Sequence, residues 1–172
     1  MVFMHEFRLS DPSSNTHTLA YRLVKERFAD TPLSSEGARR YGGRWNPVGI
    51  GILYTSSSPE LALLEQLVHL PALAYEDLPK LFLITMILPG IPTPVKDLPE
   101  NWRDPANYHQ NHRLLKDWLN QPDVMSIKVP SAVVAESHNF LLHPLHRDFG
   151  NIEILSSQPF NIDPRLWNVK NE

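Results

Sequence analysis

The stretch from residue 34 to residue 70 contains three side chains whose types suit ligand chemistry: an arginine, a tyrosine and a glutamate. Arg44 follows a Gly-Gly turn, and its planar guanidinium can bind phosphate oxygens in pairs. Tyr54 offers an aromatic face and a hydroxyl, and Glu65 can stabilise a developing positive charge. The stretch therefore predicts a functional site.

A helix must carry the glutamate, and three residues mark where this helix starts. Ser58 can cap it, Pro59 suits the first helical position, and Glu60 lies near the positive end of the helix dipole. An apolar stripe follows at three- and four-residue steps and comprises Leu61, Leu64 and Val68. Glu65 is expected to project from this stripe, so its carboxylate should be buried.

A buried carboxylate needs a partner, and Arg44 and Tyr54 are its nearest suppliers in the sequence. One hypothesis is a ligand site that contains all three residues. The alternative is a plain ion pair between Arg44 and Glu65 that fixes a helix on a sheet. These residues alone leave both hypotheses open.

Three further features each have two interpretations. Gly42 and Gly43 allow a backbone course that side chains would block, and the turn either offers N–H groups to an anion or is simply a tight loop. Arg22, in an apolar strand, points to solvent or into a polar cleft. Ser131 follows a break at Pro130, where its hydroxyl either donates into a cleft or ties up a backbone group.

The order of elements predicts an α+β fold with a mixed sheet and peripheral helices. Residues 80–88 are almost continuously apolar and suit a strand covered on both faces. Further strands are expected at 19–24, 50–55, 151–155 and, in two pieces broken at Pro130, at 125–134. Helical segments are expected at 35–41 and 108–119, and a loop at the proline-rich residues 90–105.

Composition limits the class of protein. The chain has 172 residues, of which 42% are hydrophobic and 20% charged, which favours a single domain over residues 1–172. A net charge of −3 gives no basic field, so no direct nucleic-acid partner is expected. The absence of cysteine excludes disulfides and Cys-ligated zinc. Because no long apolar run or signal-peptide pattern is present, the sequence predicts a cytoplasmic protein without a membrane partner.

Two pairs of histidines have a spacing that could ligate metal. His109 and His112 lie three residues apart, but no acidic or cysteine ligand accompanies them, which favours a solvated helix face. His143 and His146 have the same spacing, and packing and capping roles are favoured for them. We therefore expect no metal site.

Five sequence blocks together resemble the RES-domain family, the toxin components of RES–Xre toxin–antitoxin modules. The resemblance spans residues 21–149, and the GGRWN block with its trailing YTS and glutamate helix is its most specific part. In chain order the blocks are YRLV, SSEGARRYGGRWNPVG, ILYTSSSPELALLEQLVHL, VPSAVV and HNFLLHPLHRDF.

The resemblance implies a fold similar to ADP-ribosyltransferase toxins and cleavage of the bond between nicotinamide and ribose in NAD. NAD would then be a substrate, not a cofactor, and inorganic phosphate or water would be the acceptor. The family also implies an Xre-type antitoxin as partner and self-association within the complex with it.

The same resemblance assigns roles by matching motifs. The catalytic set that it implies is Arg22, Arg44, Tyr54, Glu65 and Ser131. The substrate-binding set that it implies is Arg22, Gly43, Arg44, Tyr54 and Asn139. The arginines suit the pyrophosphate, the tyrosine the nicotinamide ring, and the glutamate the oxocarbenium-like ribose. One departure is His143, where the family more often has asparagine.

Two other functions stay open at this stage. A protein ADP-ribosyltransferase would share every one of these residues and differ only in the acceptor. A non-catalytic module could bind nucleotide or a protein through the same cleft, although it would not require the whole set. A dehydrogenase-like use of NAD is disfavoured because no G-x-G-x-x-G turn opens a helix.

Overall fold

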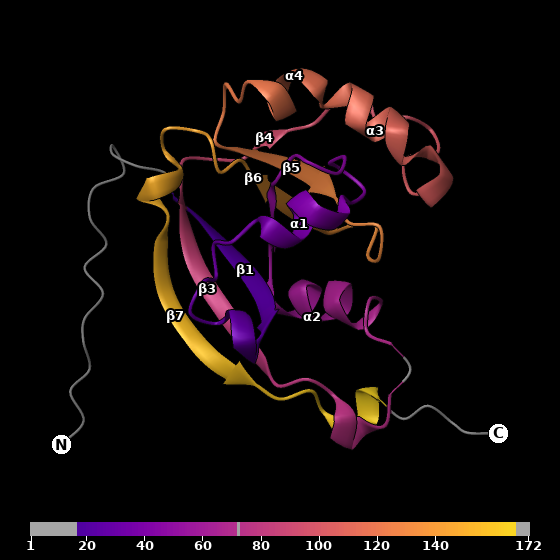
Figure 1. The fold of residues 1–172 in the computed structure, drawn as a ribbon, viewed down its shortest axis with the longest axis vertical. Helices are drawn as coiled ribbons and strands as arrows, with labels where there is room; N and C mark the ends of the chain where they lie inside the picture. The colour runs from indigo at the N-terminus through magenta and orange to yellow at the C-terminus, as the bar shows by residue number, and fades with distance from the viewer. Residues whose placement is uncertain (1–16, 72, 168–172) are drawn as a thin grey trace.

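The computed structural model describes residues 17–71 and 73–167, which form a mixed sheet with helices at its periphery (Figure 1). Within these residues the seven strands have the order β4-β5-β6-β2-β1-β3-β7, and every neighbouring pair is antiparallel except β4 and β5. The predicted α+β fold is confirmed. The strands are β1 (His17–Lys25), β2 (Leu53–Ser56), β3 (Leu81–Pro89), β4 (Thr93–Pro94), β5 (Ser126–Pro130), β6 (His138–Leu142) and β7 (Glu153–Phe160). The α-helices are α1 (Glu36–Tyr41), α2 (Pro59–Leu67), α3 (Tyr108–Leu114) and α4 (Lys116–Asn120).

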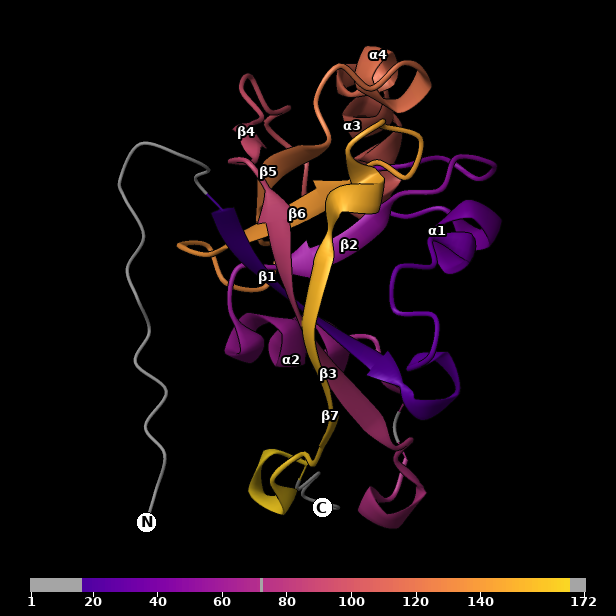
Figure 2. The same ribbon diagram turned by 90° about the vertical axis from the view of Figure 1, so that its left-hand side faces the viewer.

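The sheet consists of two parts that meet at one point. β1 pairs with β3 along its whole length, whereas β1 and β2 are joined through the pair Tyr21–Ser56. In Figure 2, β3 and β7 run nearly vertically, whereas β2 and β6 run nearly horizontally. Ser56 therefore lies where the two parts of the sheet meet, and this junction becomes important for the site.

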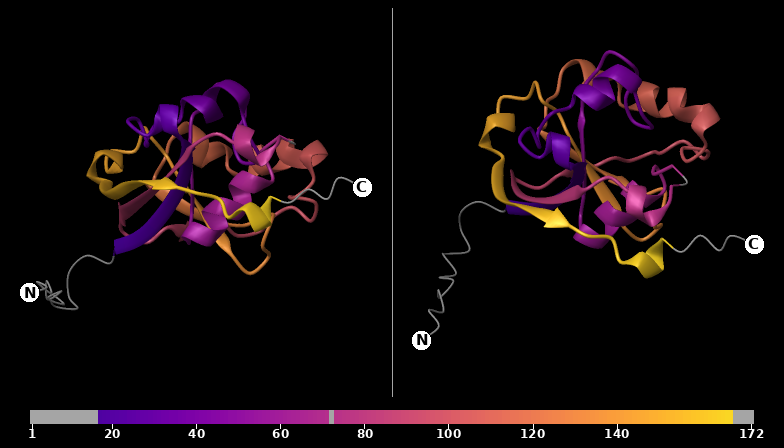
Figure 3. Two further views of the ribbon diagram at one scale, coloured as in Figure 1. Left: turned by 90° about the horizontal axis from the view of Figure 1, so that it is seen from below. Right: turned by 60° about the horizontal axis from the view of Figure 1, so that its bottom comes forward.

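Separate apolar clusters attach the helices to the sheet. The cluster under α3 and α4 comprises Trp45, Ile52, Leu115, Trp118, Leu119, Ile127, Val129 and Leu141. In Figure 1 these helices lie above β5 and β6. Leu23 of β1 packs with Leu63 and Leu67, which holds α2 against the other part of the sheet. β7, in yellow in Figure 3, is the last strand in the order and forms one edge of the sheet.

The predicted apolar stripe of α2 is wrong. Leu61 is buried, but Leu64 and Val68 are exposed. The buried residues of the helix are Leu61 and Ala62, and the half-buried Leu63 and Leu67 pack against the cluster that contains Leu23 of β1. Tertiary packing thus rotates the buried face away from the stripe that periodicity alone predicts.

The predicted helix over residues 108–119 is two helices, α3 and α4, which meet at Leu115. Leu115 has φ −92° and ψ 7°, outside the helical region. Its buried side chain joins Trp118 and Leu119 of α4 in the cluster over β5 and β6. The break changes the direction of the chain, so that α4 packs against the sheet.

Two further predictions of elements need correction. Residues 125–134, predicted as two strands broken at Pro130, contain one strand, β5, which ends at Pro130. Beyond it the N–H groups of Val133 and Val134 donate to the Ser131 hydroxyl. The predicted loop over residues 90–105 contains the short strand β4, which pairs with β5. The strands predicted at 19–24, 50–55, 80–88 and 151–155 correspond to β1, β2, β3 and β7, with shifted ends. One face of β3 is buried, through Ile84, Met86 and Leu88, whereas its other face is half-buried.

Replacing Leu141 by alanine should destabilise the fold by about 2–5 kcal/mol, because this side chain is fully buried between β6 and α4. Urea unfolding at constant pH measures the loss. Leu145→Ala is the matched control, since Leu145 is 81% exposed and its truncation should change the free energy of unfolding by less than about 0.5 kcal/mol. Similar losses for both variants would contradict this description of the core.

Candidate active site

Glu65 on α2 is held by two side chains that come from distant parts of the chain. Its Oε1 accepts hydrogen bonds from Ser131 Oγ at 2.7 Å and from Asn139 Nδ2 at 2.6 Å. Asn139 is oriented in turn by Ser56, whose Oγ donates to Asn139 Oδ1 at 2.8 Å. Among the described residues, Glu65 Oε2 accepts no hydrogen bond. One carboxylate oxygen is thus fixed and the other is available to a ligand.

The strands and the helix position this group directly. Ser56 and Asn139 are register partners in β2 and β6, so their side chains leave the sheet on the same face. Ser131 follows the last residue of β5 and is fully buried. Its Oγ accepts from the N–H groups of Val133 and Val134 while it donates to Glu65. Both roles considered for this serine, donation into the site and satisfaction of backbone groups, therefore hold.

The cap predicted for α2 is confirmed. Ser58 Oγ accepts from Leu61 N at 3.2 Å, and Pro59 is the first helical residue. Because this cap fixes where the helix starts, it also fixes which turn carries Glu65 to β6.

Tyr54 braces the glycine-rich turn with its hydroxyl. This hydroxyl donates to Asn46 Oδ1 at 2.8 Å and accepts from Trp45 N at 3.1 Å. Burial raises the pKa of the Tyr54 phenol above its usual value. The hydroxyl is therefore engaged with protein, and the role expected for it in orienting nicotinamide would need these bonds to change. A contact between the Tyr54 ring and nicotinamide stays a prediction.

The turn itself is a tight loop. Gly42 has φ +65° and donates to Ala38 O, and Gly43 N donates to Asn46 O at 2.9 Å. Because both N–H groups are used within the chain, they form no anion cradle. Gly43 is needed for a different reason: a Cβ there would lie 2.8 Å from Tyr54 Oη.

Arg44 lies over aromatic rings and not beside Glu65. Its Nη1 donates to Arg103 O at 2.9 Å, and its Cζ lies 5.6 Å from the Trp102 ring centroid and 4.9 Å from that of Tyr108. No ion pair joins Arg44 to Glu65, two residues that the structure describes, so the simple Arg–Glu pair considered from the sequence is wrong.

Arg22 makes no hydrogen bond to Glu65, Ser131 or Asn139 among the described residues. Its guanidinium donates to the carbonyl oxygens of Pro32 and Ser34. Burial lowers the pKa of Arg22 to about 10, so it remains charged at neutral pH. Within the described residues no carboxylate pairs with it. The arginine therefore points neither to open solvent nor to a protein anion.

Alternation along β2 relates the two ends of the site. Tyr54 and Ser56 are two residues apart, so their side chains lie on one face of the sheet. Tyr54 contacts the turn that carries Arg44, and Ser56 contacts the group that holds Glu65. Tyr54 and Ser56 lie about 7 Å apart along the strand. The turn that carries Arg44 and the group that holds Glu65 therefore contact the same face of β2.

The histidines contribute positioning contacts. His112 on α3 bonds Gly43 O through Nε2 at 2.8 Å, whereas His109 is exposed. His146 accepts from Asp148 N. In residues 17–71 and 73–167 no three His, Asp or Glu side chains gather to hold a metal ion. Nor does any helix of this described part have the length and apolarity to cross a bilayer.

The fully buried His143 is a neutral cap. Its Nδ1 accepts from Leu145 N at 3.2 Å, so the ring proton must lie on Nε2, which donates to Leu119 O at 3.1 Å. The ring also packs edge-on against Trp118. The packing and capping roles expected for His143 and His146 are confirmed. An asparagine here could keep the bond from Leu145 but would be too short to reach Leu119.

Sequence reasoning missed several residues around the site. Ser56 was present in the YTS motif, and its position two residues after Tyr54 on a strand was the available signal. Trp102, Tyr108 and Asn111 come from a segment interpreted as a loop and a solvated helix, and nothing in their spacing relates them to Arg44.

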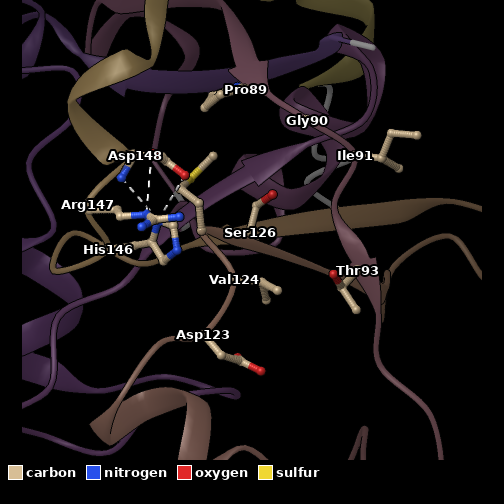
Figure 4. A pocket seen from close by; sticks show the side chains of 11 residues that line it. Pro89, Gly90, Ile91, Thr93, Asp123, Val124, Ser126, His146, Arg147 and Asp148 are labelled. Carbon is tan, nitrogen blue, oxygen red and sulfur yellow. Dashed lines mark hydrogen bonds and ion pairs between the residues drawn. The ribbon is translucent and has the colours of Figure 1, made fainter. Parts of the chain in front are cut away.

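A hollow of about 230 Å³ lies elsewhere, between the end of β3 and the loop after β6 (Figure 4). Its lining includes Ile91, Ser126, His146 and Arg147. Ser126 begins β5 and Ser131 follows its end, so the hollow and the Glu65 group lie at opposite ends of this strand. None of the predicted site residues lines it.

Comparisons with known proteins show the family to which this chain belongs. The RES domain family matches residues 19–163. The chain belongs to the RES domain family. A protein of Yersinia enterocolitica named Toxin Res is 34% identical over 151 residues, which cover 86% of this chain and 99% of that one. The Prs ADP-ribosylating toxin of a Sphingobium species is 32% identical over 142 residues, covering 78% of this chain and 86% of that one.

A solved structure supports the fold of this RES domain. The M. tuberculosis MbcT–MbcA toxin–antitoxin complex contains a chain that matches with a TM-score of 0.66 at 17% identity, covering 89% of this chain and 88% of that one. The resemblance read from the motifs is thus confirmed as family membership, and the α+β architecture is shared.

Replacing Gly43 by alanine should destabilise the protein by about 1–3 kcal/mol, because the added methyl group would overlap Tyr54 Oη, which Asn46 prevents from moving. Thermal unfolding of Gly43→Ala, Tyr54→Phe and the double variant measures the coupling free energy between the two positions. The double variant should lose less stability than the sum of the losses of the two single variants, since the Tyr54→Phe substitution removes the overlapping oxygen atom. Gly150→Ala, where nothing lies within 4 Å, is the control, and strict additivity would contradict the close approach.

Wild-type stability should fall with decreasing pH partly through His143. Burial lowers the folded-state pKa of His143 below its unfolded value of 6.5, so below that pH the unfolded chain binds more protons and is favoured. The contribution is present above pH 6.5 and is lost as the pH falls toward the folded pKa. Urea midpoints at about pH 7.5 and about pH 5.5 should therefore differ less in His143→Asn than in wild type or in the exposed-site control His138→Asn. Equal differences in all three would contradict this role.

Proposed function

We propose that this protein is a toxin that cleaves NAD at the bond between nicotinamide and ribose. The observation that carries the proposal is the carboxylate of Glu65, whose Oε1 is fixed by Ser131 and Asn139 while Oε2 is left without a donor among the described residues. A carboxylate with one oriented free oxygen suits a ligand hydroxyl or a developing positive charge.

The chemistry follows from that geometry. The C–N glycosidic bond breaks, nicotinamide leaves with the electron pair, and the ribose gains oxocarbenium character. The negative charge of Glu65 stabilises this state, and Oε2 accepts a hydrogen bond from a ribose hydroxyl. An oxygen of water or phosphate then attacks the anomeric carbon, and its proton passes to solvent. Ser131 and Asn139 act by keeping the carboxylate in place.

The anionic part of NAD requires cations that the protein does not itself neutralise. Arg22 and Arg44 form no ion pair with any carboxylate of the described residues. A partly buried guanidinium without an anion is costly, so a phosphate ligand would relieve this cost. This supports the phosphate-binding roles proposed for both arginines.

The partner is proposed to be an Xre-type antitoxin that blocks this site. The support is that one structural neighbour belongs to the toxin–antitoxin complex of MbcT and MbcA. With a net charge of −3, the toxin itself is not proposed to bind nucleic acid. A cytoplasmic location and self-association within the complex belong to the same proposal.

A second candidate is transfer of ADP-ribose to a protein, which the Sphingobium relative named Prs ADP-ribosylating toxin favours. It shares every site residue, and only the acceptor differs. NAD labelled in the adenylate half separates the candidates. NAD degradation is favoured if the label stays in small molecules and if nicotinamide is released when water or phosphate is the only acceptor present. Label incorporated into a protein of an added lysate favours transfer.

Replacing Glu65 by glutamine should abolish most nicotinamide release while the fold is retained, because the amide oxygen can still accept from Ser131 and Asn139 but the charge is lost. A reduction of about 10²–10³-fold in kcat is the expected scale for one electrostatic group. Chromatographic assay of nicotinamide measures it.

Glu60→Gln is the control, since Glu60 is an exposed carboxylate on the same helix and should be dispensable. In cells, wild-type protein should arrest growth. Both the Glu65→Gln substitution and co-expression of the proposed Xre-type antitoxin should relieve the arrest. Full nicotinamide release by Glu65→Gln, or harmless overexpression of protein that cleaves NAD, would overturn the proposal.

A further inference from the structure

Two arginines share one aromatic platform next to the glycine-rich turn. Trp102 stacks on Trp45 with ring centroids 5.5 Å apart and an interplanar angle of 24°. The Cζ of Arg44 lies 5.6 Å from the Trp102 ring centroid, and the Cζ of Arg103 lies 5.0 Å from it. Two like charges are therefore held against the same indole ring.

Neither charge is neutralised by protein. Among the described residues no carboxylate forms an ion pair with Arg44 or Arg103. The adjacent Asp104 is engaged elsewhere, since its two oxygens accept from Ala106 N and Asn107 Nδ2. Three other arginines, at 39, 40 and 165, have carboxylate partners within 2.8 Å.

The arrangement is held rigidly by α3. Asn111 Nδ2 donates to Trp102 O at 2.8 Å and to Arg44 O at 3.4 Å, and His112 Nε2 bonds Gly43 O at 2.8 Å. Arg44 Nη1 donates to Arg103 O, which ties the two arginines together directly. The backbone next to both cations is thus fixed, and a bound anion would reduce the repulsion between the two like charges held against one ring.

We propose that Arg103 and Arg44 form a phosphate subsite of this protein. Arg103 is exposed, so its guanidinium is accessible to a ligand, and Arg44 uses one of its five donors on the Arg103 carbonyl. The ligand is a phosphate group, supplied either by the pyrophosphate of the dinucleotide or by free inorganic phosphate as acceptor. This inference rests on the proposed function for the identity of the ligand, but anion binding at the subsite can be measured without any reaction.

Titration calorimetry of the purified full chain with inorganic pyrophosphate, and separately with inorganic phosphate, tests the subsite. Wild type should bind at least one of these anions, and Arg103→Ala should weaken that binding by about ten-fold or more, as expected for a lost charge-assisted hydrogen bond. Arg113→Ala is the matched control, because Arg113 is exposed on α3 and pairs with no described carboxylate. It should bind like wild type.

A kinetic arm distinguishes the two sources of phosphate. If the subsite holds the pyrophosphate, Arg103→Ala should raise the KM for NAD and leave the dependence on phosphate unchanged. If it holds free phosphate, the variant should raise the phosphate concentration needed for half-maximal rate. Equal anion affinities of Arg103→Ala and wild type, or no binding of either anion by wild type, would overturn the subsite. Absence of NAD cleavage with intact anion binding would overturn only the proposed function.

Discussion

The two hydrogen bonds on Glu65 Oε1 are the interaction on which the site depends. They link a helix, the end of β5 and the last pair of the β2–β6 ladder, so a shift in any of these would release the carboxylate. The chain of polar groups from Ser56 through Asn139 to Glu65 lies in a partly buried setting, where unpaired polar groups are costly. This cost is what keeps the carboxylate in a single orientation.

The division of the sheet explains why the group forms where it does. β1 and β2 meet at Tyr21 and Ser56, and beyond that pair the two parts of the sheet run in different directions. Ser56, at this junction, bonds Asn139, which in turn bonds Glu65 of α2. Arg44 and the Trp102 ring lie next to the glycine-rich turn. The Tyr54 hydroxyl bonds this turn, which connects it to the same face of β2.

The sequence by itself determined the local features. The cap and proline set the start of α2, the apolar run over residues 80–88 set β3, and the motifs set the family. These succeed because capping, strand composition and motif order depend on neighbouring residues. Through the resemblance it also predicted Glu65, Ser131 and Asn139 as site residues, although not that Ser131 and Asn139 bond Glu65.

Only the tertiary structure decided which groups meet. Glu65 is bound by residues 66 and 74 positions away, whereas the nearer Arg44 is directed to Trp102 and Tyr108. The buried side of α2 and the break at Leu115 were likewise set by the surfaces against which these segments pack. The physical reason is common to all of these: hydrogen bonds and apolar contacts between distant segments outweigh local periodicity, and a single sequence does not state which segments come together.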